Sequence, residues 1–139
     1  MNATVSDLMV SPVVTVTKHE RIGHARRLMH DRHVSALPVV GPEGEPIGIV
    51  TASDLVGDHR DGSPVSSVMT DAVYTVPPTA GPHVAARVMR NHHLHHIVVV
   101  DHHMVIGMLS TFDLLRVVED HRFVAKAAPT PARRPSSRV

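Results

Sequence analysis

The sequence predicts a mixed α/β (α+β) fold made from two copies of one β-α-β-β-α unit. Residues 5–9 (VSDLM) recur as residues 65–69 (VSSVM), and residues 48–55 (GIVTASDL) recur as residues 107–114 (GMLSTFDL). The offset is 60 residues for the first pair and 59 for the second, so one residue has been lost between the copies. Matching segments in matching order indicate two related supersecondary units that pack together. Any function of the chain must therefore account for two equivalent sites.

The first repeat begins with a predicted strand at residues 13–16 (VVTV), a β-branched run that follows a turn. Thr17 and Glu20 have the spacing of a capping box, so a helix is expected to begin there. Its apolar positions fall on one face at helical spacing and are expected to be buried: Ile22, Ala25, Leu28 and Met29.

The remaining residues of the first repeat are predicted to form a β-hairpin and a second helix. Residues 37–40 and 47–51 are apolar, and the segment between them is rich in Gly, Pro and Glu. Thr51 and Asp54 then open the second helix. The second repeat follows the same plan, with a strand at 73–76, a helix at 84–90, strands at 97–100 and 105–109, and a last helix from about 113 to 124.

The repeats divide the chain into residues 1–60 and residues 61–124, joined by a polar linker at residues 58–64. Two Pro-containing pairs, Pro77-Pro78 and Gly81-Pro82, are expected to disturb the start of the first helix in the second repeat. Residues 125–139 are rich in proline and arginine and have almost nothing to bury, so this basic tail is expected to be disordered.

Composition excludes several classes of protein. The chain of 139 residues has no cysteine, which excludes disulfides, thiolate nucleophiles and cysteine-based metal sites. Aromatic residues make up only 2%, so the core must be aliphatic. There is no apolar run long enough to span a membrane, and we expect a cytoplasmic protein. The net charge of +1 is too small to indicate nucleic-acid binding, and a role for the tail arginines in such binding is disfavoured.

Residues 34–40 (VSALPVV) with 48–54, and residues 95–101 (HHIVVVD) with 107–113, resemble the motifs of a tandem pair of CBS domains, also called a Bateman module. The resemblance covers residues 1 to about 124. It implies two repeats packed with pseudo-two-fold symmetry in a stand-alone module. It also implies a regulatory sensor, not an enzyme, that binds AMP, ADP, ATP or S-adenosylmethionine in clefts between the repeats. No cofactor is required, and a homodimer that signals to an unknown protein partner in trans is expected.

The resemblance implies two ligand sites, each built from both repeats. One joins Val13, Val14, Val34 and Ser35 with Met108, Ser110 and Asp113. The other joins Val73, Tyr74, Leu94 and His95 with Ile49, Thr51 and Asp54. A carboxylate at a helix start can accept hydrogen bonds from ribose hydroxyls, and aliphatic strand residues offer a slot for adenine. Tyr74 is a candidate for stacking on that ring.

The Thr51-x-x-Asp54 and Ser110-x-x-Asp113 motifs also have a simpler explanation, because the same residue types cap helices. A capping residue can contact a ligand as well, so the two interpretations are compatible. No motif of a nucleophilic, P-loop or metalloprotease site occurs in the sequence.

Histidine is abundant, with 13 residues, of which four lie between positions 92 and 96. The resemblance to CBS domains implies that His95 and His96 are candidate phosphate contacts, assisted by Arg32, Arg90 or Lys18. Two alternatives stay open: a metal site, for which His93 and His95 are the candidates, and solvated surface histidines without a function. The competing functions are accordingly a histidine-rich metal-binding stress protein and a ligand-free dimerisation scaffold. Because Ser35-Ala36 of the first repeat corresponds to His95-His96, the two sites are expected to differ in affinity.

Overall fold

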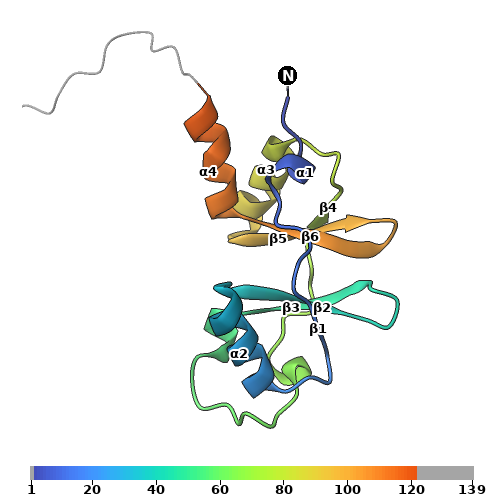
Figure 1. Cartoon of the computed structure of the whole chain (residues 1–139), viewed down its shortest axis with the longest axis vertical. Coiled ribbons are helices and arrows are strands. Elements are labelled where there is room, and N and C mark those ends of the chain that lie inside the picture. Colours follow the sequence, from blue (N-terminus) through green and yellow to red (C-terminus); the bar gives the residue numbers. More distant parts are fainter. Residues whose placement is uncertain (1, 122–139) are drawn as a thin grey trace, which may run out of the picture.

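The computed structural model describes residues 2–121 and consists of two similar units stacked on each other (Figure 1). In the first unit the order is β1 (Val16–Thr17), α2 (Ile22–Arg32), β2 (Ala36–Val40), β3 (Pro46–Thr51) and the 3-10 turn η1 (Ala52–Leu55). In the second it is β4 (Thr75–Val76), α3 (Pro82–His92), β5 (His96–Asp101), β6 (Met104–Ser110) and α4 (Thr111–Asp120). The two sheets face each other, and the helices cover their outer faces. The predicted mixed fold is confirmed.

Each unit contains one three-stranded sheet with the same topology. The orders are β1-β2-β3 and β4-β5-β6, with the first pair of strands parallel and the second antiparallel. Val39 pairs with Gly48, and Val99 pairs with Gly107. The offset between the repeats is 60 from Val39 to Val99 and 59 from Gly48 to Gly107. The lost residue therefore lies in the hairpin between these positions, where a change of length is easily accommodated.

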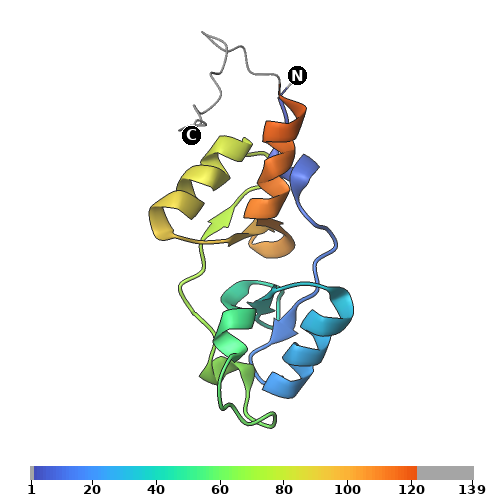
Figure 2. The same cartoon turned by 90° about the vertical axis from the view of Figure 1, so that its left-hand side faces the viewer.

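The two units exchange their N-terminal segments. Helix α1 (Val5–Leu8) packs in the second unit, where the Val5 N–H donates to the Ala80 carbonyl at 2.8 Å. The equivalent 3-10 turn η2 (Val65–Ser67) packs in the first unit, where the Val65 N–H donates to the Glu20 carbonyl at 2.7 Å. Figure 2 shows the two extended connections that cross between the units. Each sequence repeat therefore completes the core of the other.

The cores are aliphatic, as predicted, and they use equivalent positions. The first contains Val16, Ile22, Ala25, Met29, Leu37, Val39, Val50, Leu55 and Val65. The second contains Val5, Leu8, Val76, Ala85, Met89, Ile97, Val99 and Leu109. No polar or charged side chain of residues 2–121 is fully buried. Burial of branched aliphatic side chains supplies the main stabilisation in both units.

Several predicted elements differ from the structure. The strands expected at 13–16 and 73–76 are limited to β1 and β4, because most of the preceding residues cross between the units. Of these residues, Tyr74 still accepts a backbone hydrogen bond from Val98 of β5 at 3.3 Å. The second helix of the first repeat is only the turn η1, since the chain leaves it at Val56 for the polar linker. At the other end, α4 stops at Asp120, and the tail at 125–139 lies outside the described residues.

Two predictions about helix starts were wrong. Thr17 and Glu20 close a turn before α2, with the Thr17 N–H donating to Glu20 Oε2 at 2.7 Å, and α2 itself begins at Ile22 after Arg21. Pro82 does not disturb α3 but occupies its first turn, where a missing N–H costs nothing. Within residues 2–121, the helices are too short or too polar to cross a membrane.

Candidate functional site

Two cavities of similar size lie between the units, at positions related by the repeat. Cavity 1 has a volume of about 580 Å³ and is lined by Val10, Pro12, Val13, Val14, Arg32, His33, Val34, Ser35, Ala36, Leu37, His95, His96, Met108, Ser110, Thr111, Phe112 and Asp113. Cavity 2 has a volume of about 550 Å³ and is lined by Ser35, Ile49, Thr51, Ala52, Ser53, Asp54, Thr70, Ala72, Val73, Tyr74, His93, Leu94, His95, His96 and Val98. Both volumes are in the range of small-molecule sites.

The structure brings together every residue of both predicted sites. All seven residues of the first set line cavity 1, and all seven of the second set line cavity 2. His96, the additional predicted phosphate contact, lines both. The grouping is the one that the resemblance to CBS domains implied: each cavity combines the segment before the first strand and the start of the second strand of one repeat with the Thr/Ser-x-x-Asp motif of the other. That these residues bind a ligand stays a prediction.

The two Thr/Ser-x-x-Asp motifs are reciprocal capping boxes, as the simpler interpretation expected. The Thr51 N–H donates to Asp54 Oδ2 at 2.8 Å, and the Asp54 N–H donates to Thr51 Oγ1 at 3.4 Å. The Ser110 N–H donates to Asp113 Oδ2 at 2.8 Å, and the Asp113 N–H donates to Ser110 Oγ at 3.1 Å. These bonds satisfy amides that a helix start leaves unpaired.

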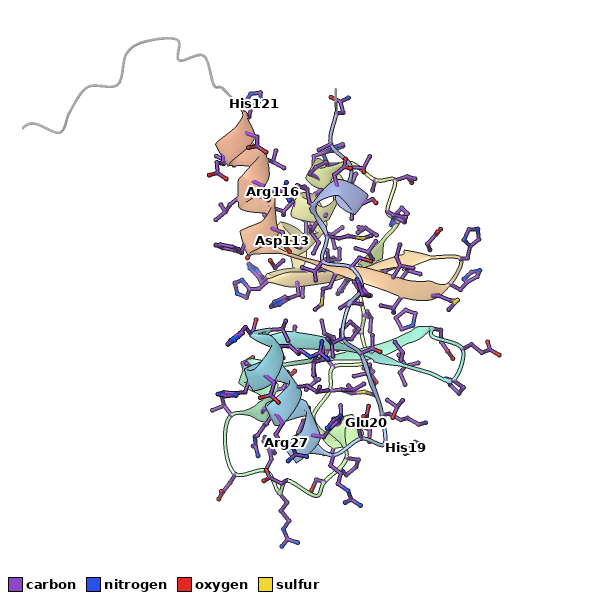
Figure 3. All side chains as sticks on the ribbon, viewed as in Figure 1. His19, Glu20, Arg27, Asp113, Arg116 and His121 are labelled. Carbon is purple, nitrogen blue, oxygen red and sulfur yellow. The ribbon has the colours of Figure 1, made fainter. Side chains whose placement is uncertain are left out.

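Capping leaves half of each carboxylate available. Within residues 2–121, Oδ1 of Asp54 and Oδ1 of Asp113 take part in no hydrogen bond or ion pair, while Oδ2 of each is held by the cap. Figure 3 shows Asp113 at the end of α4 nearest the first unit. Each cavity therefore presents one fixed carboxylate oxygen that can accept a hydrogen bond from a ligand.

Three residues belong to both cavities: Ser35, His95 and His96. Ser35 Oγ lies 3.2 Å from His96 Nε2, so this pair joins the two repeats directly. Burial lowers the pKa of His96, and the neighbouring charge of His95 lowers it further, whereas the Asp113 carboxylate opposes both effects. Without a ligand, His96 is therefore mainly neutral at pH 7.

The remaining lining differs between the cavities. Cavity 1 contains Arg32 and His33 at the end of α2, together with the exposed ring of Phe112. In cavity 2, Tyr74 is stacked on His92 with ring centroids 4.0 Å apart, so one face of the only tyrosine is already covered. Sequence reasoning missed His33 and Phe112 as cavity residues. His33 had a signal, since it is the repeat partner of His93.

Of the three expected phosphate helpers, only Arg32 reaches one of the two cavities. Arg90 lines a third, shallower cavity of about 490 Å³ beside α3 and α4, and Lys18 lines none of the three. The pattern of positive residues along the sequence could not distinguish these three residues, because only the fold shows that Lys18 lies in the turn before α2 and that Arg90 faces the third cavity.

The metal hypothesis gains no support from the described part of the chain. No group of three or more His, Asp or Glu side chains within residues 2–121 is arranged to hold an ion. The histidine-rich segment is divided: His92 ends α3, His93 follows it in a left-handed conformation, and His96 begins β5. His93 and His95 both line cavity 2 but lack a third ligand there.

Relatives of known sequence match most of the chain. It is 30% identical over 134 residues to the uncharacterized protein MJ1404 of Methanocaldococcus jannaschii, covering 84% of this chain and 32% of the relative. It is 31% identical over 117 residues to the CBS domain-containing protein YhcV of Bacillus subtilis, covering 81% and 83%. The chain thus spans about a third of the first relative and most of the second.

Solved structures show the same fold. The CBS domain pair of protein MJ0100, in complex with 5-methylthioadenosine and S-adenosyl-L-methionine, has a TM-score of 0.79 at 22% identity and covers 86% of this chain and 98% of that one. CBSX2 in complex with AMP has a TM-score of 0.75 at 22% identity, covering 85% and 97%. Hypoxic Response Protein I, with two coordinated zinc ions, has a TM-score of 0.74 at 23% identity, covering 82% and 98%.

The two repeats also match a known family directly. Residues 5–58 and residues 65–120 each correspond to one CBS domain, so together they account for nearly all of the described chain. The match agrees with the duplicated sheets, the exchanged N-terminal segments and the two related cavities. The chain belongs to the CBS domain family and carries a tandem pair of these domains.

Proposed function

We propose that this protein is a regulatory sensor that binds adenosine-containing ligands, AMP, ADP, ATP or S-adenosylmethionine, in the cavities between its two repeats. The observation that carries the proposal is the reciprocal construction of the cavities. Each one combines apolar residues of one repeat with a fixed carboxylate of the other. Such a cavity fits a ligand with a flat, mainly apolar ring and vicinal hydroxyls.

The chemistry of an adenosine ligand matches the groups in cavity 1. Adenine would lie against Val13, Val14 and Val34, where backbone groups beside the strands can recognise its nitrogens. The ribose hydroxyls would donate to Oδ1 of Asp113. A phosphate would lie near Arg32, whose guanidinium pairs well with phosphate oxygens.

The structural neighbours support this ligand class. The MJ0100 pair was solved with 5-methylthioadenosine and S-adenosyl-L-methionine, and CBSX2 was solved with AMP. These three ligands share an adenosine moiety and differ in the group at its 5′ position. The shared moiety is what the apolar slot and the carboxylate of each cavity would recognise here.

Sensing follows from the position of the cavities. A ligand that contacts both repeats favours the relative orientation of the units in which both sets of contacts form, and so shifts the population of that orientation. A protein partner in trans would respond to the altered surface. We also propose a homodimer, supported by the exposed apolar side chains Leu115 and Val118 on α4, which are both 56% exposed.

Thermal unfolding with a ligand panel tests the proposal. The full chain is heated with AMP, ADP, ATP, S-adenosylmethionine, NADH or Zn²⁺, and at least one adenosine ligand is expected to raise the melting temperature. Asp113→Asn and Asp54→Asn are expected to reduce the shift, because the amide can still cap but is a weaker acceptor for ribose. Asp7→Asn is the control, since Asp7 caps α1 in the same way but lines no cavity.

Each outcome of the panel has a definite meaning. A shift with an adenosine ligand that Asp7→Asn preserves and a cavity variant reduces supports the proposal. A shift with Zn²⁺ alone supports metal binding and rejects the sensor. No shift with any compound also rejects it and favours a structural scaffold.

A further inference from the structure

The two cavities are not separate sites, because they meet at a common wall. Ser35, His95 and His96 line both of them, and the 3.2 Å contact between Ser35 Oγ and His96 Nε2 lies in this wall. We call these three residues the junction. In the repeat, Ser35 corresponds to His95. These two residues directly precede the equivalent strands β2 and β5, and His96 is the first residue of β5.

The junction matters because the cavities have unequal positive charge. Cavity 1 contains Arg32, which is charged at any physiological pH, in addition to His33. Among residues 2–121, no lysine or arginine lines cavity 2, and the lining groups that can become positive are His93 and the two junction histidines. An anionic ligand in cavity 2 would therefore depend on histidines that cavity 1 also uses.

The helix ends reinforce this inequality. Cavity 1 is lined by Ser110 and Thr111 at the start of α4, a helix of ten residues whose dipole favours an anion. The equivalent end at cavity 2 begins η1, which has four residues and provides almost no dipole. Each cavity contains one aspartate, so cavity 2 with neutral histidines has a net negative lining, whereas in cavity 1 Arg32 balances Asp113.

We propose that the junction couples the cavities, so that the chain binds one phosphorylated adenosine ligand in cavity 1 together with an uncharged or cationic adenosine ligand in cavity 2. This inference rests on the proposed function and specifies which ligand charge each site accepts. A phosphate in cavity 1 would take up the donors of Ser35, His95 and His96. A second phosphate would find those donors occupied and would be repelled by the first phosphate at short range.

Isothermal titration calorimetry on the full chain tests the coupling with AMP and adenosine as probes. AMP is expected to bind one site per chain, and any second AMP is expected to bind at least about tenfold more weakly. Adenosine added to the AMP-saturated protein is expected to bind a second site, because it carries no phosphate to be repelled.

A pair of arginine variants locates the first AMP. Arg32→Gln is expected to weaken that binding by about tenfold or more, which corresponds to losing one hydrogen-bonded charge pair. Arg27→Gln is the matched control, since Arg27 lies on the same helix (Figure 3) and lines neither cavity. Its AMP affinity is expected to equal that of the unchanged chain.

The outcomes separate this inference from the proposed function. Two AMP molecules bound with equal affinity would overturn the coupling but keep the adenosine sensor. The coupling also fails if AMP-saturated protein takes up no adenosine, if Arg32→Gln leaves AMP binding unchanged, or if only adenosine or S-adenosylmethionine binds. If no adenosine compound binds, the proposed function itself is wrong.

Discussion

At the scale of single residues, the histidines have unusual backbone conformations. His33 and His93 directly follow α2 and α3 as their C-cap residues, with φ of 55° and 56°. His102 and His103 form the turn of the second hairpin, with φ of 50° and 68°. A non-glycine residue in this left-handed region costs roughly 1–2 kcal/mol. Among these four residues, the helix-ending pair lines the cavities, whereas the hairpin pair lies at none of them.

His103→Gly is therefore expected to stabilise the protein by about 1 kcal/mol, because glycine adopts the left-handed conformation without the steric cost. The free energy of unfolding, measured by urea denaturation, checks this value. His19→Gly is the control: His19 is exposed in a turn but has no positive φ, so glycine there is expected to give no gain. Equal stabilisation by both variants would contradict the explanation.

His96 gives a prediction about pH. Its pKa is lowered in the free protein by burial and by His95, with Asp113 opposing, so it is mainly neutral at pH 7. A phosphate near its ring would raise that pKa, and the complex would take up a proton. AMP affinity is then expected to rise about three- to tenfold as pH falls from 8 to 6.5.

Calorimetry at a series of pH values measures this effect, and His96→Ala is the control. Alanine is the residue at the equivalent position of the first repeat, Ala36. The phosphate of AMP titrates equally in both experiments, so a difference between the two proteins reports on His96. The rise is expected to be smaller in His96→Ala. An affinity that is flat between pH 8 and 6.5 in the unchanged chain would remove the phosphate role of His96.

At the scale of elements, the exchanged N-terminal segments explain why glycine recurs at Gly48 and Gly107. A Cβ at Gly48 would lie 2.6 Å from Met69 Sδ and 3.1 Å from the Thr70 carbonyl oxygen. At Gly107 the corresponding distances are 2.6 Å to Met9 Sδ and 2.9 Å to the Val10 carbonyl oxygen. Backbone hydrogen bonds join Thr70 to Ile49 of β3 and Val10 to Met108 of β6. The segments that cross between the units are therefore held against these strands and cannot easily move away.

Gly48→Ala and Gly107→Ala are each expected to destabilise the protein by about 1–3 kcal/mol through overpacking at this crossing. Chemical denaturation measures the change. Gly62→Ala is the matched control, because the nearest atom to its added Cβ is 3.5 Å away and its φ is not positive. Destabilisation of the same size at Gly62 would show that the loss does not arise from the crossing.

The sequence predicted those helices and strands well whose position depends on a local pattern of apolar residues. It predicted poorly the segments that pass from one unit to the other. The face of α2 with Ile22, Ala25 and Met29 followed from helical spacing, and these residues are buried. The strand expected at 13–16 shrank to β1 because the residues before Val16 leave the sheet for the other unit. No local pattern distinguishes an extended crossing from a paired strand, since both favour β-branched residues.

For the cavities, the resemblance to CBS domains was more informative than any single motif. It placed Thr51 and Asp54 opposite Tyr74, and Ser110 and Asp113 opposite Val13. It could not show that the junction is shared, because Ser35 and His96 approach each other only through the packing of the two units. The stacking of Tyr74 on His92 could not be predicted from the sequence either, because it depends on how the two side chains are placed in the folded chain.

At the scale of the whole molecule, the pseudo-symmetry is incomplete on the outer surface. The second unit ends in the ten-residue helix α4, which lies beside α3, whereas the first unit has only η1 and a linker at that place (Figure 2). Helix α4 has no buried residue, and several of its apolar side chains are exposed. This face supports the proposed homodimer.

Leu115→Asp combined with Val118→Asp is expected to convert the proposed dimer to a monomer, because two charges would have to lose their hydration in an apolar contact. Sedimentation velocity reports the mass of the particle. Met104→Asp is the control, since Met104 is similarly exposed, at 51%, but lies on the hairpin of the second sheet. If the double variant keeps the mass of the unchanged chain, α4 does not form the contact.

The central claim is that an adenosine ligand binds between the repeats, and a crystal structure of the full chain with saturating AMP tests it most directly. The account predicts AMP in cavity 1, with the ribose hydroxyls on Oδ1 of Asp113, adenine against Val13 and Val34, and the phosphate near Arg32. AMP bound outside both cavities, or both cavities empty at saturating AMP, would contradict it.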